Sequence, residues 1–101
     1  MSFGLSAEDW SLIVDLAINP LKAKKAQVWI FGSRARGDHT KFSDLDVLFV
    51  PDKAQPITLA ELSTIKENLE ESHLPIKVDI VANQDLATDY RENVERDRVR
   101  V

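Results

Sequence analysis

Residues 27–50 read QVWIFGSRARGDHTKFSDLDVLFV, and this stretch decides how the chain folds. It contains two runs rich in β-branched and aromatic residues, at 27–31 and 45–50, which predict two buried strands. The first run ends at Gly32, a residue that commonly terminates a strand. Between the two runs lies a polar, arginine-rich segment, residues 33–39. Two strands joined by a polar turn therefore form the centre of the predicted fold.

A helix is predicted before this stretch. Ser6 is expected to cap it, with Asp9 three residues later in the position of a capping-box partner. Apolar residues then recur at helical spacing and form one face: Trp10, Ile13, Val14, Ala17 and Ile18. Because the residue before a proline avoids helical backbone angles, the pair Asn19-Pro20 is expected to end this helix.

Further elements follow the two strands. Thr58 and Glu61 form a capping box that predicts the start of a second helix. Its apolar stripe is expected to be Leu59, Leu62, Ile65 and Leu69. A third strand is predicted over residues 76–82, and the charged segment from Gln84 is expected to be weakly helical and then extended at residues 99–101. The order of elements predicts an α/β (α+β) fold in which helices back one small mixed sheet.

The size and composition of the chain exclude several classes of protein. At 101 residues, of which 44% are hydrophobic and 30% charged, the chain is expected to fold as a single domain over residues 1–101. A net charge of −4 argues against binding nucleic acid through bulk charge. There is no cysteine, which excludes disulfides and thiolate zinc sites. Neither a membrane-spanning run nor an export signal is recognisable, so a cytoplasmic protein is expected.

Three carboxylates interrupt the apolar strands. Asp44 and Asp46 flank Leu45, and the period of two in a strand places both on one face. Asp79 lies in the middle of the predicted third strand, and all three converge if that strand pairs with the second. Two carboxylates about 5 Å apart repel by roughly 3 kcal/mol at an effective dielectric of 20, so such a cluster requires protons or a cation. Oxygen ligands alone favour Mg²⁺ or Mn²⁺.

Each carboxylate also has a simpler interpretation. Asp44 alone is equally compatible with an ordinary turn residue at the start of a strand. For Asp79, a salt bridge to Lys77 is the simpler explanation, but strand neighbours two residues apart stay partly solvated, which leaves the charge poorly accounted for. A charged group in the middle of a strand is rarely buried unless it is paired, so Asp79 is the stronger functional candidate.

A second candidate site begins where the first strand ends. A glycine at position 32 lets a ligand approach the backbone closely, and a helix starting at Ser33 offers N–H groups to an anion. The Ser33 hydroxyl and the Arg36 guanidinium are both suited to phosphate oxygens. An ordinary strand-to-helix turn with two solvated arginines, Arg34 and Arg36, is the alternative interpretation.

The spacing of the two sites is more specific than either alone, because ten residues separate Gly-Ser from Asp-x-Asp. GSRARG at 32–37 followed by SDLDV at 43–47 resembles the signature of the DNA polymerase β-like nucleotidyltransferase superfamily. The short chain resembles the minimal nucleotidyltransferase (MNT) branch of that superfamily, and the resemblance covers residues 27–82. It implies a mixed sheet backed by helices, the polymerase β-like nucleotidyltransferase fold.

The resemblance also implies the roles of individual residues. The three carboxylates would hold two Mg²⁺ ions, with Mn²⁺ as a possible substitute, and would carry catalysis, with the third carboxylate accepting a proton. The β- and γ-phosphates of ATP would lie on the Gly-Ser turn, with an arginine as a further phosphate contact. The residues implied are Asp44, Asp46 and Asp79 for metal and catalysis, and Gly32, Ser33 and Arg36 for the nucleotide.

The same resemblance suggests an acceptor. MNT proteins of this kind are similar to the antitoxins of HEPN/MNT toxin–antitoxin pairs, which attach AMP to a tyrosine of the partner HEPN ribonuclease. The implied partner is thus a HEPN-type toxin in a hetero-oligomer, without direct contact to nucleic acid or membrane. A non-catalytic antitoxin that binds nucleotide, or nothing, and covers its partner is the alternative. Tyr90 is interpreted as a surface or packing residue in preference to a self-modification site.

Overall fold

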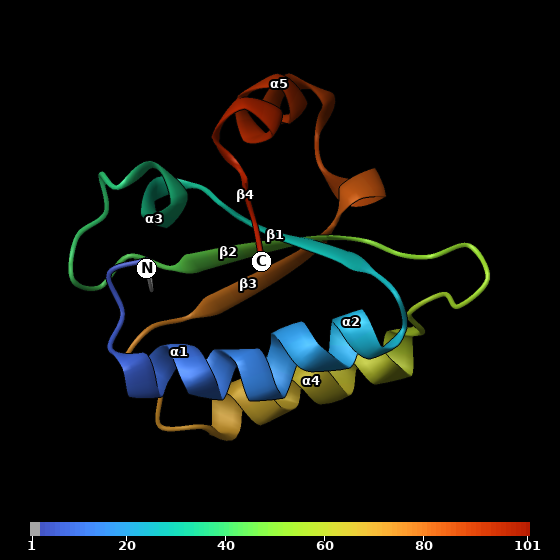
Figure 1. Ribbon diagram of the computed structural model, residues 1–101, viewed down its shortest axis with the longest axis horizontal. Coiled ribbons are helices and arrows are strands. Elements are labelled where there is room, and N and C mark those ends of the chain that lie inside the picture. Colours follow the sequence, from blue (N-terminus) through green and yellow to red (C-terminus); the bar gives the residue numbers. More distant parts are fainter. Residues whose placement is uncertain (1–2) are drawn as a thin grey trace.

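The computed structural model describes residues 3–101, which form a four-stranded mixed sheet with helices on both faces (Figure 1). The order of strands in the sheet is β3-β2-β1-β4. Strand β1 is antiparallel to β2 and β4, and β2 is parallel to β3. The strands are β1 (Gln27–Phe31), β2 (Leu45–Val50), β3 (Val78–Ala82) and β4 (Val99–Arg100). The predicted fold class, a mixed sheet with packed helices, is confirmed.

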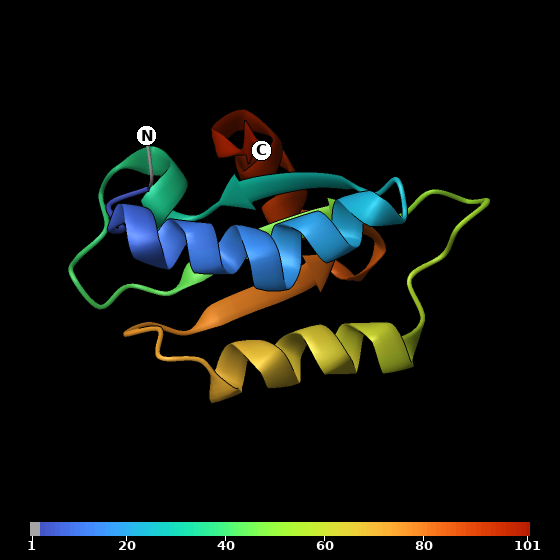
Figure 2. The same cartoon turned by 60° about the horizontal axis from the view of Figure 1, so that its bottom comes forward.

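Helices cover the two faces unequally. The first helical stretch and α4 lie side by side along one face, and α5 lies over the other (Figures 1 and 2). The helices are α1 (Ala7–Ile13), the π-helical η1 (Val14–Ile18), α2 (Asn19–Ala23), α3 (Ser33–Arg36), α4 (Leu59–Glu71), the 3₁₀ turn η2 (Asn83–Asp85) and α5 (Thr88–Asp97). None of the helices within residues 3–101 is long and apolar enough to cross a membrane.

Alternation along β2 divides the core into two parts. Leu45, Val47 and Phe49 are buried against the two-helix face and belong to the main core. Leu48 points to the other face, where it packs with Trp29 and Val94 of α5 in a smaller cluster. The intervening Asp46 lies on the α5 face, since successive side chains of a strand point to opposite sides. Asp46 therefore lies on the same face of the sheet as α5, where it is only partly buried.

Local sequence signals predict most of the elements correctly. The bounds of β1 and β2 match the predicted strands at 27–31 and 45–50. Strand β3 begins at Val78, two residues later than predicted, although the Lys77 carbonyl already accepts a hydrogen bond from the Leu45 N–H at 3.0 Å. The charged segment after Gln84 does form a helix, α5, and then the short strand β4.

The prediction that Asn19-Pro20 ends the first helix is wrong. Ser6 caps the helix as expected, but the helical path continues through Pro20 to Ala23. A proline inside an α-helix removes a hydrogen bond and clashes with the carbonyl four residues back. Here the preceding turn is π-helical, and the Asn19 N–H donates to the Val14 carbonyl five residues back. This wider turn lets Pro20 occupy the first turn of α2, where its missing N–H costs little.

The apolar stripe predicted for α4 is also partly wrong. The capping box between Thr58 and Glu61 is present, and Ile65 and Leu69 are buried. Leu59, however, is 84% exposed. It occupies the first position of the helix, whereas the buried positions of α4 lie in its later turns, so helical spacing alone overestimates the length of the buried stripe.

Substitutions on α4 test this assignment. Leu69→Ala, at a position that is 7% exposed, is expected to lower the free energy of unfolding by about 2–4 kcal/mol because it leaves a cavity in the core. Leu59→Ala is the matched control and is expected to change it by less than about 0.5 kcal/mol. Urea denaturation followed by circular dichroism measures both. Equal losses in the two variants would show that Leu59 packs against the core.

Candidate active site

The strand register brings two of the predicted carboxylates together. In the parallel ladder between β2 and β3, Asp46 lies directly beside Asp79. On its other side, Asp46 lies opposite Phe31, the last residue of β1. Asp44 precedes β2 and lies two residues before Asp46, which places it at the same end of the sheet. The predicted pairing of the second and third strands is therefore confirmed.

Gly32 joins the carboxylates to the turn after β1. Its φ of 77° lies in the region that side-chain-bearing residues rarely adopt, and Gly32 caps the four-residue helix α3 that begins at Ser33. A Cβ atom at this position would collide with Oδ2 of Asp46. The Asp46 carboxylate thus lies directly against the Gly32 backbone. The Gly-Ser turn and the Asp-x-Asp motif, ten residues apart in sequence, form one site.

Negative charges outnumber positive ones around Asp46. Partial burial, followed by the neighbouring charges of Asp79 and Asp44, raises the pKa of Asp46 from 3.8 to about 6, and Arg36 opposes the shift. Asp79 forms an ion pair with Lys77, with 3.3 Å between Lys77 Nζ and Asp79 Oδ1. Both partners of this pair are solvent-accessible, so it stabilises the fold only weakly. The charged form of Asp46 is therefore destabilised in this site.

The chemistry and placement of the carboxylates fit a hard divalent cation, although their present rotamers do not form a ligand set. Within residues 3–101, no three Asp, Glu or His side chains approach closely enough to hold a metal ion. Asp79 is directed to Lys77, and Asp46 rests on Gly32. The donors are all carboxylate oxygens, which Mg²⁺ prefers, and they gather at one end of two paired strands. A cation would also offset the mutual repulsion that raises the pKa of Asp46.

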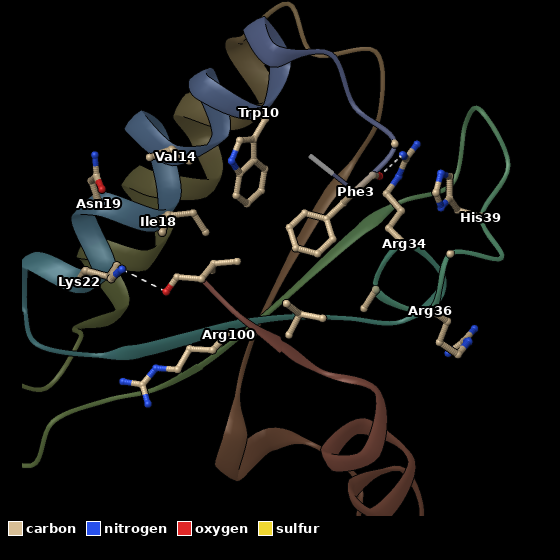
Figure 3. A pocket seen from close by; sticks show the side chains of 15 residues that line it. Phe3, Trp10, Val14, Ile18, Asn19, Lys22, Arg34, Arg36, His39 and Arg100 are labelled. Atoms are coloured by element: carbon tan, nitrogen blue, oxygen red, sulfur yellow. Dashed lines mark hydrogen bonds between the residues drawn. The ribbon is translucent and has the colours of Figure 1, made fainter. Parts of the chain in front are cut away.

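The two arginines of the turn have different roles, which the sequence did not reveal. Arg34 is 3% exposed and donates hydrogen bonds to four main-chain carbonyls, so it is a structural residue. Figure 3 shows its guanidinium beside Phe3. The bonds include 2.9 Å to the Phe3 carbonyl and 2.9 Å to the Ser43 carbonyl. Arg34 thereby fixes the loop that delivers Asp44 to the site.

Arg36 is the exposed member of the pair. Its Nε lies 3.1 Å from Asp38 Oδ2, and its Nη1 lies 3.7 Å from Asp97 Oδ2 on α5. The predicted phosphate contact is therefore engaged by two carboxylates in this structure. The Asp38 side chain is exposed, and such a surface pair exchanges readily with other anions, whereas the Asp97 side chain is only 15% exposed.

Cavities lie on both sides of Asp46. One, of about 610 Å³, is bordered by Asp46, Asp79 and α4. Another, of about 400 Å³, is bordered by Gly32, Arg36 and α5. A third, of about 890 Å³, lies between the first helix, α3 and β4 and is lined by none of the three carboxylates (Figure 3). The site thus has two separate openings, one beside the Gly-Ser turn and one beside Asp79.

Paired substitutions test the different roles of the two arginines. Arg34→Lys is expected to lower the free energy of unfolding by about 2–3 kcal/mol, because an ammonium cannot reproduce the planar fork and leaves buried carbonyls unpaired. Arg36→Lys is the control and should leave the urea midpoint close to that of the wild type. An unchanged midpoint for Arg34→Lys would show that the buried contacts do not stabilise the fold.

The pH dependence of stability tests the environment of Asp46. An acid with a higher pKa in the folded state makes folding less favourable as the pH rises between its unfolded and folded pKa values. For Asp46 this window runs from 3.8 to about 6. With EDTA present, Asp46→Asn should therefore be more stable than the wild type at about pH 7.5 and should lose this advantage near pH 4. Urea midpoints at both pH values measure the difference, and a less stable variant at the higher pH contradicts it.

Comparisons with known proteins agree with this geometry. The family model described as "Nucleotidyltransferase domain" matches residues 16–101. A Haemophilus influenzae protein named "Probable protein adenylyltransferase MntA" is 35% identical over 69 residues, which are 68% of this chain but only 59% of that protein. A Methanocaldococcus jannaschii protein assigned as protein adenylyltransferase MJ0126 is 35% identical over 77% of this chain and 78% of its own length.

Solved structures share the fold. A structure assigned as a minimal nucleotidyltransferase superimposes with a TM-score of 0.64 at 33% identity, covering 92% of this chain and 95% of the other. A toxin–antitoxin crystal structure with AMP-PNP gives a TM-score of 0.63 at 21% identity, covering 85% of this chain and 69% of the other. The resemblance predicted from the GSRARG and SDLDV motifs is confirmed. The chain belongs to the nucleotidyltransferase domain family and is a protein of the minimal nucleotidyltransferase type.

Proposed function

We propose that this protein is a divalent-metal-dependent adenylyltransferase that moves AMP from ATP to a tyrosine hydroxyl of a partner protein, a HEPN-type toxin that it silences. The observation that carries this proposal is the placement of Asp46, which lies beside Asp79 on one side and against the Gly32 backbone on the other. A carboxylate pair and a phosphate-binding turn in direct contact are what transfer from a nucleoside triphosphate requires.

The nucleotide would bind at the turn after β1. Gly32 presents bare backbone, so phosphate oxygens can approach closely, and the Ser33 hydroxyl is suited to donate to one of them. Arg36 would exchange its exposed partner Asp38 for a further phosphate oxygen and keep its contact with Asp97, because a charge-assisted guanidinium–phosphate contact is stronger than an exposed ion pair. These three residues would hold the β- and γ-phosphates.

Asp44, Asp46 and Asp79 would hold the cations. When bound, Mg²⁺ or Mn²⁺ ions lower the pKa of the attacking hydroxyl and neutralise the departing pyrophosphate. A nearby positive charge would stabilise the charged form of Asp46, whose pKa is raised by burial and by its acidic neighbours. Asp79 would exchange Lys77 for this role, and its ion pair with that exposed lysine is weak enough to allow it.

The transfer itself is a single displacement. The acceptor oxygen forms a bond to the α-phosphorus of ATP, the bond from that phosphorus to the β-bridging oxygen breaks, and pyrophosphate leaves. Asp79 is the best-placed acceptor for the hydroxyl proton, because it borders the cavity on the side of Asp46 away from the Gly-Ser turn. The acceptor hydroxyl would thus enter beside Asp79 while the triphosphate lies beside Gly32.

The choice of a protein as acceptor rests on the relatives. The H. influenzae relative is named as a protein adenylyltransferase, and a toxin–antitoxin structure has the same fold. The HEPN class follows from the resemblance of the motifs to MNT antitoxins.

Radiolabel transfer tests the activity. Label from ATP carrying ³²P at the α position is expected to move to a tyrosine of a co-expressed HEPN-type partner only when Mg²⁺ or Mn²⁺ is present. Asp79→Asn is expected to lower the rate about 10²–10⁴-fold while leaving nucleotide binding intact, as for loss of a general base. Asp15→Ala, on the opposite face of the molecule, is the control with wild-type activity.

The double variant Asp44→Ala/Asp46→Ala separates the proposal from the non-catalytic alternative. Loss of both label transfer and neutralisation of the partner supports catalysis. Neutralisation at the wild-type level by this variant would show that the protein acts by covering its partner. No transfer with any of the four nucleotides would reject the adenylyltransferase activity.

A further inference from the structure

One face of α5 borders the cavity beside the Gly-Ser turn. Tyr90, Asn93, Val94 and Asp97 all line this cavity, and their spacing of i, i+3, i+4 and i+7 places them on the same side of the helix. Gly32 lines the cavity from the turn after β1. The cavity is therefore continuous with the proposed triphosphate site, and it measures about 400 Å³, within the range of small-ligand pockets.

Two of these residues fix the rotation of α5 about its axis. Val94 is buried and packs with Trp29 and Leu48 of the sheet. Asp97 lies 3.7 Å from Arg36 and also accepts a hydrogen bond from the neighbouring Arg96 at 3.1 Å. The packing of Val94 and the ion pair of Asp97 hold this face of α5 toward the sheet. Tyr90 and Asn93 lie on the same face and therefore line the cavity.

The remaining lining has the chemistry of a nucleobase site. Phe31 and Leu86 are half-buried apolar walls, and both belong to or pack against the small cluster under α5. Tyr90 is 63% exposed, so its ring is available to stack on a flat ligand. Asn93 adds a neutral amide, which both donates and accepts hydrogen bonds. An asparagine amide matches the N6 donor and N7 acceptor of adenine, whereas guanine presents two acceptors at the corresponding edge.

We infer that this cavity holds the base of the bound nucleotide, with Tyr90 as the stacking wall and Asn93 as the residue that selects adenine over guanine. The inference rests on the proposed function for the position of the triphosphate on Gly32 and Ser33. It assigns the two openings of the site to different substrates: the base enters beside α5, and the acceptor enters beside Asp79. Asn93 is a specificity-determining residue in this arrangement and takes no part in the chemical step.

Binding measurements test the inference without requiring turnover. The probes are ATP and GTP analogues in which a methylene replaces the bridging oxygen between the α- and β-phosphorus atoms, together with inorganic tripolyphosphate, which has no base. Isothermal titration calorimetry with Mg²⁺ gives the dissociation constants. The wild type is expected to bind the ATP analogue more tightly than the other two.

Substitutions on α5 should change affinity according to the base. Asn93→Ala is expected to weaken the ATP analogue about tenfold and to leave tripolyphosphate unchanged, because only a contact to the base edge is lost. Asn93→Asp should weaken the ATP analogue without improving the GTP analogue, since a carboxylate cannot donate to N7 of adenine and is repelled by the two acceptors at the same edge of guanine. Tyr90→Ala should weaken both analogues, and Tyr90→Phe should restore them because the ring remains. Asn68→Ala, an exposed asparagine on α4, is the matched control.

The outcomes separate this inference from the proposed function. Equal binding of the two analogues by the wild type, or an unchanged ATP affinity in Asn93→Ala, overturns the assignment of the cavity even if AMP transfer is observed. The expected pattern of affinities in a protein that transfers no AMP supports the base site and rejects the activity. Failure of all three probes to bind the wild type rejects the triphosphate site and the base site together. Loss of helical content in a variant is detected by circular dichroism, and Tyr90→Phe then decides the role of the ring.

Discussion

The contact between the Asp46 carboxylate and the bare backbone of Gly32 is the constraint on which the site depends. It requires β1 and β2 to be antiparallel neighbours, so that the end of one strand lies opposite the beginning of the other. It also requires glycine at position 32, because a Cβ atom there would collide with Asp46 and because the φ of this residue is positive. The parallel pairing of β3 then adds Asp79 beside Asp46. Three segments distant in sequence are thereby brought to one end of the sheet.

The packing of the protein does not explain the electrostatic cost of this arrangement. Asp46 is partly buried between like charges, and nothing in the packing of the main core requires a carboxylate at that position. The site instead lies on the face that α5 covers incompletely, next to openings large enough for ligands. A structural role would favour a neutral residue there, whereas binding of cations and phosphates makes use of both the charge and the access.

The sequence predicted those features that depend on local patterns. The strands β1 and β2 and the caps at Ser6 and Thr58 follow from periodicity and capping chemistry, which act over a few residues. Other features were missed because they depend on contacts distant in sequence. The four carbonyls that surround Arg34 come from Phe3 and from the loop before β2, so no pattern near the arginine announces its burial. The exposure of Leu59 and the passage of the helix through Pro20 likewise depend on packing and on an altered hydrogen-bond register.

The short strand β4 has a consequence for contacts between copies of the protein. It has only two residues, and the guanidinium groups of Arg98 and Arg100 lie over the Trp29 ring, 4.4 Å and 5.5 Å from its centroid. The outer edge of the sheet therefore offers very few main-chain groups for pairing, and positive charges surround them. Short edge strands flanked by charge resist the addition of a strand from a neighbouring molecule. Strand β4 therefore makes this edge of the sheet unfavourable for pairing with another molecule, while Arg98 and Arg100 cover the Trp29 ring.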